Sequence, residues 1–461
     1  MKVVIVNANI VVPHKDLILE NSSLVIDNGI ITRIDKGIRY SFNTSANAIV
    51  DAEGGYLIPG LINNHSHGFT LGPFGPNGGK PISFELLFRN LNRHLLQGTT
   101  TLINLDGFAN IEEVEIINKL HPIKIKTGTI HAPLNIKVAE MSDGTGLTPL
   151  HKSLTVKDML DRGAVVIGEA GAGSTLGGSA ASYSVIPKAF KQKTGQTIST
   201  AQAEKLKISI LGKYMDPSVA KKENVQRILE ETGLKTSLTA DEAIDLIVKA
   251  VYTPVGAARD GIREAAELAL KYDVPVIVHN AAASKNVVIE VAKRLGPKLI
   301  AGHSNHPSYD KDEMLEVARE LKKLGAIVDI MSGDSFGVKQ LCTSDWWLDA
   351  TLKLIEEGLV DLLSTDLCAG YWDSMLMIIE KAVEKNILSL PKAIAMASYN
   401  VVKAIPKLSP DYGTIDVGKT ADLAILNANK LSRVEYVLID GIPVVINGQI
   451  NVPKPILSFG S

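Results

Sequence analysis

The chain has 461 residues, of which 45% are hydrophobic and 21% are charged, a composition typical of a folded globular protein with one large or two modest domains. Its 48 basic and 50 acidic side chains give a formal net charge of -2 and are spread along the chain, which excludes the basic surfaces that bind nucleic acid or anionic membranes. We therefore expect the partner to be a small molecule, or a second copy of the chain in a homo-oligomer.

The cysteines and the first residues indicate the compartment. Two cysteines, Cys342 and Cys368, are too few for a disulfide framework and fit a reducing environment. The opening "MKVVIVNANIVVPHKD" has no basic segment that leads into an apolar run and a small-residue cleavage site. No window of the sequence is apolar for the length of a membrane span. These features predict a cytoplasmic protein with no membrane partner.

Both ends of the chain are predicted to form β-structure. Near the start, short apolar runs alternate with turns, and Asn28-Gly29 is typical of a hairpin. Near the end, "VEYVLIDGIPVVINGQI" has the same texture, with a turn at Asn447-Gly448. Because isolated hairpins are only marginally stable, we expect residues 1–58 and 408–461 to combine in one small β-sandwich.

The central part, residues 59–407, alternates buried strands with helices. Eight apolar runs are predicted strands: "YLIPGLINNHSH", "TTTLINLD", "IKIKTGTIHA", "AVVIGEAG", "VPVIVHN", "KLIAGHSNH", "AIVDIMSG" and "VDLLSTD". Amphipathic segments such as "ISFELLFRNLNRHLLQG", "ARDGIREAAELALKY" and "KDEMLEVARELKKLG" separate most of them. Eight such units predict an α/β fold with a parallel sheet closed into a (β/α)8, or TIM, barrel.

One interval, residues 174–253, is too long for a loop of this barrel. Ser199 with Gln202, and Thr239 with Glu242, have the spacing of helix capping boxes. We predict an inserted helical subdomain, and because it follows strand four it should lie at the C-terminal face of the barrel. It could serve there as a lid, or be a plain packing or oligomer-forming insert.

The candidate chemistry begins with two histidines, His65 and His67, in "PGLINNHSHG". Residues two apart in a strand point to the same side, so both imidazoles can grip one metal ion. Taken alone, this pattern also fits two ordinary polar residues at a strand end.

Four further polar residues end other predicted strands, which favours a metal site. A buried carboxylate or imidazole is costly unless it is paired or bound to metal, and strand ends of a barrel converge on one mouth. The predicted ligands are His65, His67, Glu169, His279, His303 and Asp366, from strands one, four, five, six and eight.

This donor set suits two divalent transition ions, zinc first and iron, cobalt or manganese as alternatives. We expect His65, His67 and Asp366 on one ion, His279 and His303 on the other, and Glu169 between them. Two such ions can share a hydroxide at neutral pH and polarise a carbonyl, which is hydrolytic chemistry. Asp366 is also the candidate catalytic residue, because a carboxylate at that point can carry a proton to a leaving nitrogen. It could instead be a ligand and nothing more.

Other polar residues near the same face are assigned smaller roles. His131, at the end of strand three, is a candidate substrate-binding residue or a structural histidine. Asn104 and Asp106 are interpreted first as ordinary loop-start residues, and His306 as solvated. Aromatic residues after strands seven and eight could line an apolar pocket for a ring or simply pack the loops: Trp346, Trp347, Tyr371 and Trp372.

Together, these motifs resemble the amidohydrolase superfamily of metal-dependent hydrolases. The resemblance is carried by "PGLINNHSHG", the strand-four glutamate, the two later histidines, "STD" and the C-terminal "YGTIDVGKTADLAIL", and it covers essentially the whole chain except the insert. Many members bridge their metals with a carboxylated lysine on strand four. This chain has Glu169 there, which looks more like the enamidase type.

The resemblance implies hydrolysis of a C-N bond in a small, cyclic amide. Two alternatives stay open. The first is a deaminase of the same superfamily that acts on an amino-substituted heterocycle, and the second is a non-catalytic scaffold on this fold. A scaffold should lack one or more ligands, whereas this sequence has all six.

Overall fold

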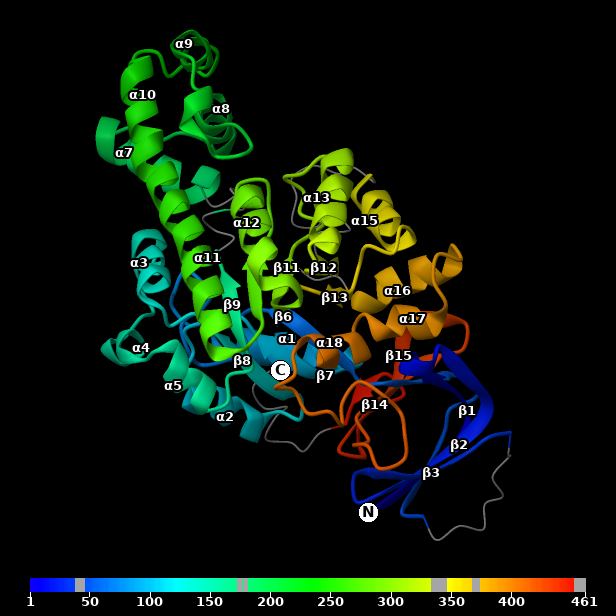
Figure 1. The fold of residues 1–461 in the computed structure, drawn as a ribbon. Coiled ribbons are helices and arrows are strands. Elements are labelled where there is room, and N and C mark those ends of the chain that lie inside the picture. Colours follow the sequence, from blue (N-terminus) through cyan, green and yellow to red (C-terminus); the bar gives the residue numbers. More distant parts are fainter. Residues whose placement is uncertain (38–45, 172–175, 177–180, 333–345, 367–373, 452–461) are drawn as a thin grey trace.

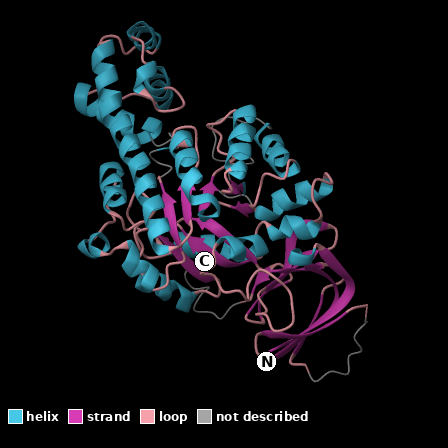
Figure 2. Ribbon diagram, in the orientation of Figure 1, coloured by secondary structure: helices cyan, strands magenta, loops and turns pink. Residues whose placement is uncertain are grey.

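Two β-sheets organise the chain, which the computed structural model describes for residues 1–37, 46–171, 176, 181–332, 346–366 and 374–451. An eight-stranded sheet lies at the centre of the molecule with helices around it, and a nine-stranded sheet lies at one end (Figure 2). The central sheet carries the candidate ligands, so its geometry decides where they meet.

The central sheet is parallel, and its strands neighbour one another in chain order. They are β6 (Leu61–Ser66), β7 (Thr99–Asn104), β8 (Lys124–Thr129), β9 (Val166–Ala170), β10 (Val276–His279), β11 (Leu299–Gly302), β12 (Ile327–Met331) and β13 (Leu362–Ser364). The first and last strands meet where the Asp366 N–H donates to the His65 carbonyl oxygen at 3.0 Å and the Asn63 side chain bonds to Thr365. The predicted (β/α)8 barrel is therefore confirmed, as a nearly closed barrel.

Helices surround the barrel. They are α1 (Phe84–Leu96), α2 (Ile111–Leu120), α3 (Pro133–Ser142), α4 (Pro149–Ser153), α5 (Val156–Asp161), α11 (Thr253–Tyr272), α12 (Lys285–Leu295), α13 (Lys311–Lys323), α15 (Trp346–Glu356), α16 (Met375–Glu384), α17 (Leu390–Ala395) and α18 (Tyr399–Ala404). The three amphipathic runs quoted above form α1, α11 and α13. Ser83 and Asp310 start α1 and α13 by accepting a backbone N–H three residues on.

The first predicted strand is in fact two. The run "YLIPGLINNHSH" is divided at Gly60 into β5 (Tyr56–Pro59), which pairs in the nine-stranded sheet, and β6, which opens the barrel. A Cβ atom on Gly60 would lie 2.2 Å from the Thr100 hydroxyl, so only glycine fits where the chain crosses from one sheet to the other. The long apolar run did not reveal this crossing, because both halves are buried.

The two chain ends form the nine-stranded sheet. Its strands are β1 (Lys2–Val12), β2 (Leu17–Asp27), β3 (Ile30–Asp35), β4 (Ala48–Asp51), β5, β14 (Leu423–Asn427), β15 (Lys430–Ile439), β16 (Ile442–Ile446) and β17 (Gln449–Ile450). Strands from both ends lie side by side in Figure 1. In this sheet β14 pairs with β5, and β5 pairs with β1. Apolar residues of both ends share one core, so the predicted sandwich layering comes from a single sheet that curls around that core.

Both predicted hairpin turns are present. Asn28-Gly29 joins β2 to β3 and Asn447-Gly448 joins β16 to β17. All four turn residues have positive φ, between 49° and 82°, as the turns that match the twist of paired strands require.

The predicted helical insert lies between β9 and α11 and projects from the barrel (Figure 1). Its helices are α7 (Ile186–Thr194), α8 (Thr200–Leu211), α9 (Lys222–Glu231) and α10 (Ala240–Ile247). Both predicted capping boxes are present at the starts of α8 and α10. The remaining helical segments among the described residues are single turns of 3-10 or π-helix at Pro13–Lys15, Ala181–Val185, Pro217–Val219, Val248–Tyr252 and Gly296–Lys298.

The insert contacts the C-terminal face of the barrel through α13. Lys213 and Tyr214, just after α8, bond to the buried Glu313 carboxylate, each at 2.8 Å. Arg259 of α11 donates to the Tyr214 carbonyl oxygen at 2.7 Å. The insert therefore packs against α13 and α11, and its role as a lid remains a prediction.

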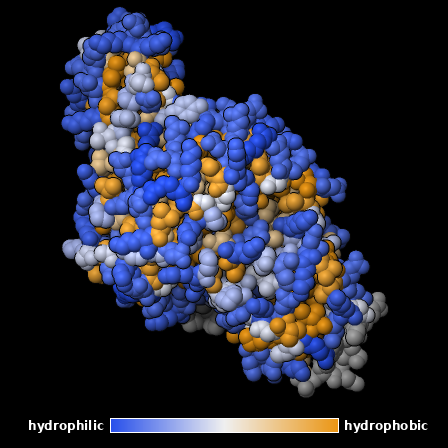
Figure 3. Space-filling model, viewed as in Figure 1, coloured by the Kyte–Doolittle hydropathy of each residue, from blue (hydrophilic) through white to orange (hydrophobic). Residues whose placement is uncertain are grey.

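Hydrophilic residues cover most of the face in Figure 3, and the insert shows apolar residues among them. Ile208, Tyr214 and Val219 are its large exposed apolar side chains among the described residues.

Within the part of the chain that the structure describes, no helix combines the length and the apolar character needed to cross a membrane.

A partly buried ion cluster joins the two sheets. Lys124, the first residue of β8, contacts both Asp422 and Asp440 at 2.7 Å. The Asp422 side chain is only 5% exposed, so its charge depends on this lysine.

Replacing Lys124 by methionine is expected to lower the free energy of unfolding by about 3 kcal/mol, because it leaves a buried carboxylate without its cation and beside a second carboxylate. Urea denaturation checks the value. Lys385→Met is the matched control, since Lys385 faces Asp349 at 3.6 Å on the open surface and its loss should have little measurable effect. Equal stability of the two variants would contradict the structural role of Lys124.

Candidate metal centre

The six predicted ligands meet at the C-terminal ends of the barrel strands. His65 lies in β6 and His67 directly follows it, Glu169 lies in β9, and His279 ends β10. His303 directly follows β11, and Asp366 comes two residues after β13. All six are buried, with Asp366 the most exposed at 7%. Segments far apart in the sequence thus supply one cluster.

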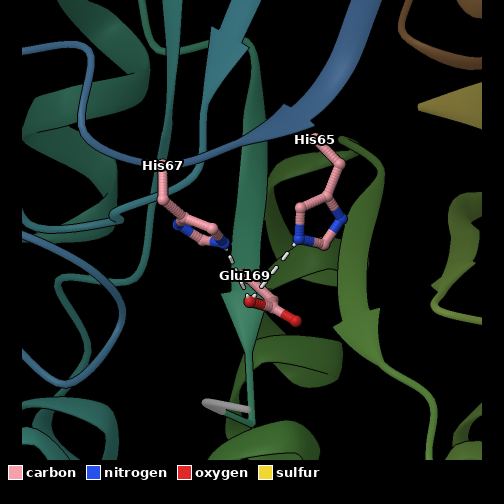
Figure 4. A group of neighbouring side chains, drawn as sticks. All are labelled: His65, His67 and Glu169. Atoms are coloured by element: carbon pink, nitrogen blue, oxygen red, sulfur yellow. Dashed lines mark ion pairs between the residues drawn. The ribbon is translucent and has the colours of Figure 1, made fainter. Parts of the chain in front are cut away.

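Glu169 lies between two pairs of histidines. Its Oε2 atom faces the Nε2 atoms of His65 and His67 at 3.6 and 3.4 Å, and Figure 4 shows both rings pointing from β6 toward this carboxylate. Its Oε1 atom faces Nδ1 of His279 at 2.7 Å and Nε2 of His303 at 3.5 Å. Each carboxylate oxygen therefore serves a different pair of imidazoles.

Asp366 spans the same cluster from the opposite side. Its Oδ1 atom lies 3.4 Å from Nε2 of His67 and 3.8 Å from Nε2 of His65. Its Oδ2 atom lies 3.7 Å from Nε2 of His303. Both carboxylates of the set are thus shared between the two sides of the cluster.

Among the described residues, three overlapping groups have the geometry to hold a metal ion, each with its donor atoms within 4.8 Å of one another. They are His65, His67 and Glu169; His65, His303 and Asp366; and Glu169, His279 and His303. The first and third groups share only Glu169. This arrangement is compatible with the predicted division into two ions with Glu169 between them.

The backbone turns two of the ligands in an unusual way. His303 and Asp366 have φ values of 60° and 48°, a left-handed conformation that side chains other than glycine adopt rarely. Such positions cluster at functional sites. Gly302 also contributes, because a Cβ atom there would approach the His65 ring at 3.1 Å.

The electrostatics of the cluster favour ligating forms of three residues. Burial lowers the pKa of His65, and burial together with the neighbouring His303 lowers the pKa of His279, so both rings are held neutral. Burial alone would raise the pKa of Glu169, but its interactions with His65 and His279 outweigh this and hold it well below the usual range.

His67 behaves differently. Burial would lower its pKa, but the carboxylates of Asp106, Asp366 and Glu169, 3.3 to 3.4 Å from its ring nitrogens, outweigh burial and raise the pKa well above the usual value. Binding of a metal ion at His67 would therefore have to displace a proton.

Unpaired nitrogen atoms test whether the residues fit metal ions. Within the described part of the chain, Nε2 of His65 is buried and has no hydrogen-bond partner, although it faces two carboxylates. A buried polar atom without a partner is rare and calls for an explanation. Four imidazoles and two carboxylates around such an atom are the donor set that zinc, iron, cobalt and manganese accept. The residues therefore fit divalent ions.

His131, the predicted substrate-binding residue, follows β8 and belongs to none of these ligand groups among the described residues. Its Nδ1 atom lies 3.0 Å from the Thr129 hydroxyl, and its ring lies against Phe108. Burial lowers its pKa to about 4, so it is neutral near pH 7. Its buried Nε2 atom has no partner within the described ranges.

Two residues with small predicted roles lie against the ligands. Asp106 is 3.3 Å from Nδ1 of His67, and the His306 ring lies 5.3 Å from that of His279. In the sequence, Asp106 stands just after β7, a position that does not distinguish it from an ordinary loop residue. Tyr371 and Trp372 lie outside the described residues, as does the side chain of Trp346, whereas Trp347 is buried in α15.

Comparisons with known proteins agree with this geometry. A sequence profile of the amidohydrolase family matches residues 190–450, more than half of the chain, including His279, His303 and Asp366. No curated protein matches the chain.

Several solved structures share the fold. L-hydantoinase (dihydropyrimidinase) from Arthrobacter aurescens aligns over 100% of this chain and 98% of its own at 14% identity, with a TM-score of 0.58. Beta-aspartyl dipeptidase from Fervidobacterium islandicum AW-1, in complex with a beta-Asp-Leu dipeptide, aligns over 98% of both chains at 15% identity, with a TM-score of 0.56. A prolidase complexed with N-methylphosphonate-L-proline aligns over 97% of this chain and 100% of its own at 15% identity, with a TM-score of 0.55.

The chain therefore belongs to the amidohydrolase family. It is a hydrolase of the class that acts on carbon-nitrogen bonds, in a family that is typically metal-dependent.

Proposed function

We propose that this protein is a binuclear metal-dependent amidohydrolase that hydrolyses the C-N bond of a small cyclic amide. The observation that carries the proposal is the position of Glu169, whose two oxygens face different pairs of histidines at 2.7 to 3.6 Å. A carboxylate in this position can be shared by two ions, as a bridging ligand must be.

The glutamate also suggests the type of enzyme. Glu169 occupies the strand-four position at which many members of the superfamily carry a carboxylated lysine. Its length allows the carboxylate to reach both histidine pairs directly, so no modified lysine is required. We therefore propose an enamidase-like centre in which His65, His67, Glu169, His279, His303 and Asp366 hold two ions, zinc first and iron, cobalt or manganese as alternatives.

Metal ions bound at this cluster would lower the pKa of a water molecule and polarise the substrate carbonyl. The protein side chains then provide the proton transfer. As a C-O bond forms at the carbonyl carbon and the C-N bond breaks, the proton of the attacking water passes to Asp366 and from there to the leaving nitrogen. Asp366 suits this role because its side chain is 10% exposed, the most open of the ligands toward the mouth of the barrel.

The substrate class rests on the buried residue His131 and on the similar structures. His131 is neutral, and its buried Nε2 atom has no partner among the described residues, so we propose that it hydrogen-bonds a polar group of the substrate. The dipeptide in the dipeptidase complex carries an amide bond, and the hydantoinase name refers to a cyclic one. At identities near 15% these names support a bond type and do not define a substrate.

The remaining parts of the proposal concern location and assembly. The two cysteines and the balanced charge support a cytoplasmic protein. The exposed apolar residues of the insert, among them Ile208 and Val219, support a homo-oligomer.

Product mass tests the proposed reaction. Metal-loaded protein is incubated with lactams, cyclic imides, acyclic amides and amino-substituted heterocycles, with Glu169→Gln protein as the control for contaminating activity. Addition of one water without loss of nitrogen is the expected result. Replacement of an amino group by oxygen would instead identify a deaminase. No reaction from protein that holds two metal ions would contradict the proposed substrate class.

A further inference from the structure

Asp106 is a buried carboxylate whose polar contacts, among the described residues, are with two backbone N–H groups and one histidine ring and with no lysine or arginine. It follows β7, and only 1% of its surface is exposed. Its oxygens accept the N–H groups of Gly68 at 3.0 Å and Gly75 at 2.7 Å, and its Oδ1 atom lies 3.3 Å from Nδ1 of His67. A buried carboxylate is costly, and neutral N–H groups alone would be satisfied by an amide oxygen. The negative charge therefore has its natural partner in the His67 ring.

The orientation of the His67 ring shows how its contact with Asp106 can affect metal binding. A histidine that binds metal through Nε2 offers the lone pair of that atom and carries its one ring proton on Nδ1, which in His67 is the nitrogen that faces Asp106. That Nε2 atom points into the cluster, 3.4 Å from both Glu169 and Asp366. Asp106 thus selects the tautomer that can bind a metal ion, although the contact is at ion-pair distance without the alignment of a full hydrogen bond.

Of the three histidines His65, His67 and His279, only His67 has a carboxylate against its outer nitrogen among the described residues. Within the described residues, Nδ1 of His65 and Nε2 of His279, the nitrogens that face away from the Glu169 carboxylate, have no hydrogen-bond partner. His67 has a carboxylate in that place. Asp106 should therefore affect the ion held by His65, His67 and Glu169 and not the ion held through His279.

We propose that Asp106 is a positioning residue, which fixes the tautomer and orientation of His67 and so strengthens one of the two metal positions. The inference rests on the proposed function in that the cluster must bind metal. It goes beyond that function by assigning a role to a residue outside the ligand set. Carboxylates behind metal-binding histidines contribute about 10- to 100-fold to metal affinity in other proteins.

The main competing explanation is that Asp106 only anchors the loop after β6 through Gly68 and Gly75. Asn104 offers a matched control. It is buried, lies two residues earlier, and accepts the N–H of Phe69 in the same loop at 3.2 Å. In contrast to Asp106, Asn104 contacts no ligand imidazole among the described residues, so Asn104→Ala should loosen the loop without disturbing His67.

The experiment measures zinc affinity by competition with a chelator for wild type, Asp106→Ala, Asp106→Asn and Asn104→Ala. We expect Asp106→Ala to bind one of two ions about 10- to 100-fold more weakly and the other unchanged. Asp106→Asn retains an acceptor for both loop N–H groups and for His67, so it should fold normally and fall between wild type and Asp106→Ala. Asn104→Ala should bind both ions as wild type does. Equal losses in Asp106→Ala and Asn104→Ala would overturn the proposal.

Ring NMR of the metal-free proteins separates this proposal from the proposed function. Nitrogen-15 spectra of the histidine rings report which nitrogen carries the proton. At a pH high enough for the His67 ring to be neutral, we expect its one proton on Nδ1 in wild type and in Asp106→Asn, and a mixture of tautomers in Asp106→Ala. If wild type binds no metal, the proposed function fails while this readout still decides the role of Asp106. An unchanged His67 tautomer in Asp106→Ala would overturn it.

Discussion

Replacement of Glu169 by glutamine is expected to abolish hydrolysis and to reduce the bound metal from two ions per chain to one or fewer. Glutamine keeps the length of the side chain but replaces one ligand oxygen by an NH2 group, which donates hydrogen bonds and cannot bind a cation. Both histidine pairs lose a shared carboxylate at once. We expect kcat/KM to fall at least about a thousandfold, equivalent to about 4 kcal/mol of transition-state stabilisation.

Glu113→Gln is the matched control for this variant. Glu113 also contacts a histidine, His151 at 3.1 Å, and caps α2, but it lies outside the ligand groups. Its replacement should leave the metal content and kcat/KM unchanged and affect stability only. Mass spectrometry of the desalted proteins counts the metal. Two tightly bound ions and nearly normal activity in Glu169→Gln would exclude a bridging role for this residue.

The Asp366→Asn variant should retain metal and lose turnover. Four histidines and Glu169 remain to hold the ions, whereas asparagine cannot accept and return a proton. We expect kcat to fall by about 10²- to 10⁴-fold at full metal occupancy, the usual contribution of general acid-base catalysis. Steady-state kinetics in the presence of excess zinc measures this change.

The same measurement decides between the two roles that the sequence left open for Asp366. A residue that acts only as a ligand would show reduced metal content, and excess zinc would restore kcat. Asp361→Asn serves as the control, because Asp361 lies just before the start of the same strand, where it pairs with Lys322. It should leave kcat unchanged. Recovery of wild-type kcat by zinc in Asp366→Asn would exclude proton transfer by this side chain.

Much of the fold could be predicted because its signals are local. Buried strands alternate with amphipathic helices, and the polar start signals at Ser199 and Thr239 each begin a helix in the structure. The division of the first strand at Gly60 could not be predicted, because it depends on the distant Thr100. The single curled sheet at the chain ends was also out of reach, since it requires β5 to pair with β14 across most of the sequence.

The candidate site was predictable for a different reason. Parallel strands of a barrel end at one mouth, so a polar residue at a strand end can be placed without any knowledge of contacts. His279 and Glu169 were found in this way and lie 2.7 Å apart in the structure. Which oxygen of Glu169 faces which histidine depends on side-chain directions that no spacing encodes.

Asp106 shows the limit of this reasoning. It follows a strand end as the ligands do, yet its neighbours are two loop N–H groups and the outer nitrogen of His67. Those contacts arise because Gly68, with φ of 80°, turns the chain back after β6. A sequence does not show where such a loop returns, so a supporting carboxylate could not be told from an ordinary loop residue.

The central claim is that the six residues hold two metal ions with Glu169 between them. The most direct test is anomalous X-ray diffraction from crystals grown with zinc and recorded at the zinc edge. We predict two anomalous peaks inside the barrel mouth, one beside each oxygen of the Glu169 carboxylate. Absence of any peak at this cluster in crystals of folded, zinc-treated protein would contradict it, as would peaks only on the outer surface.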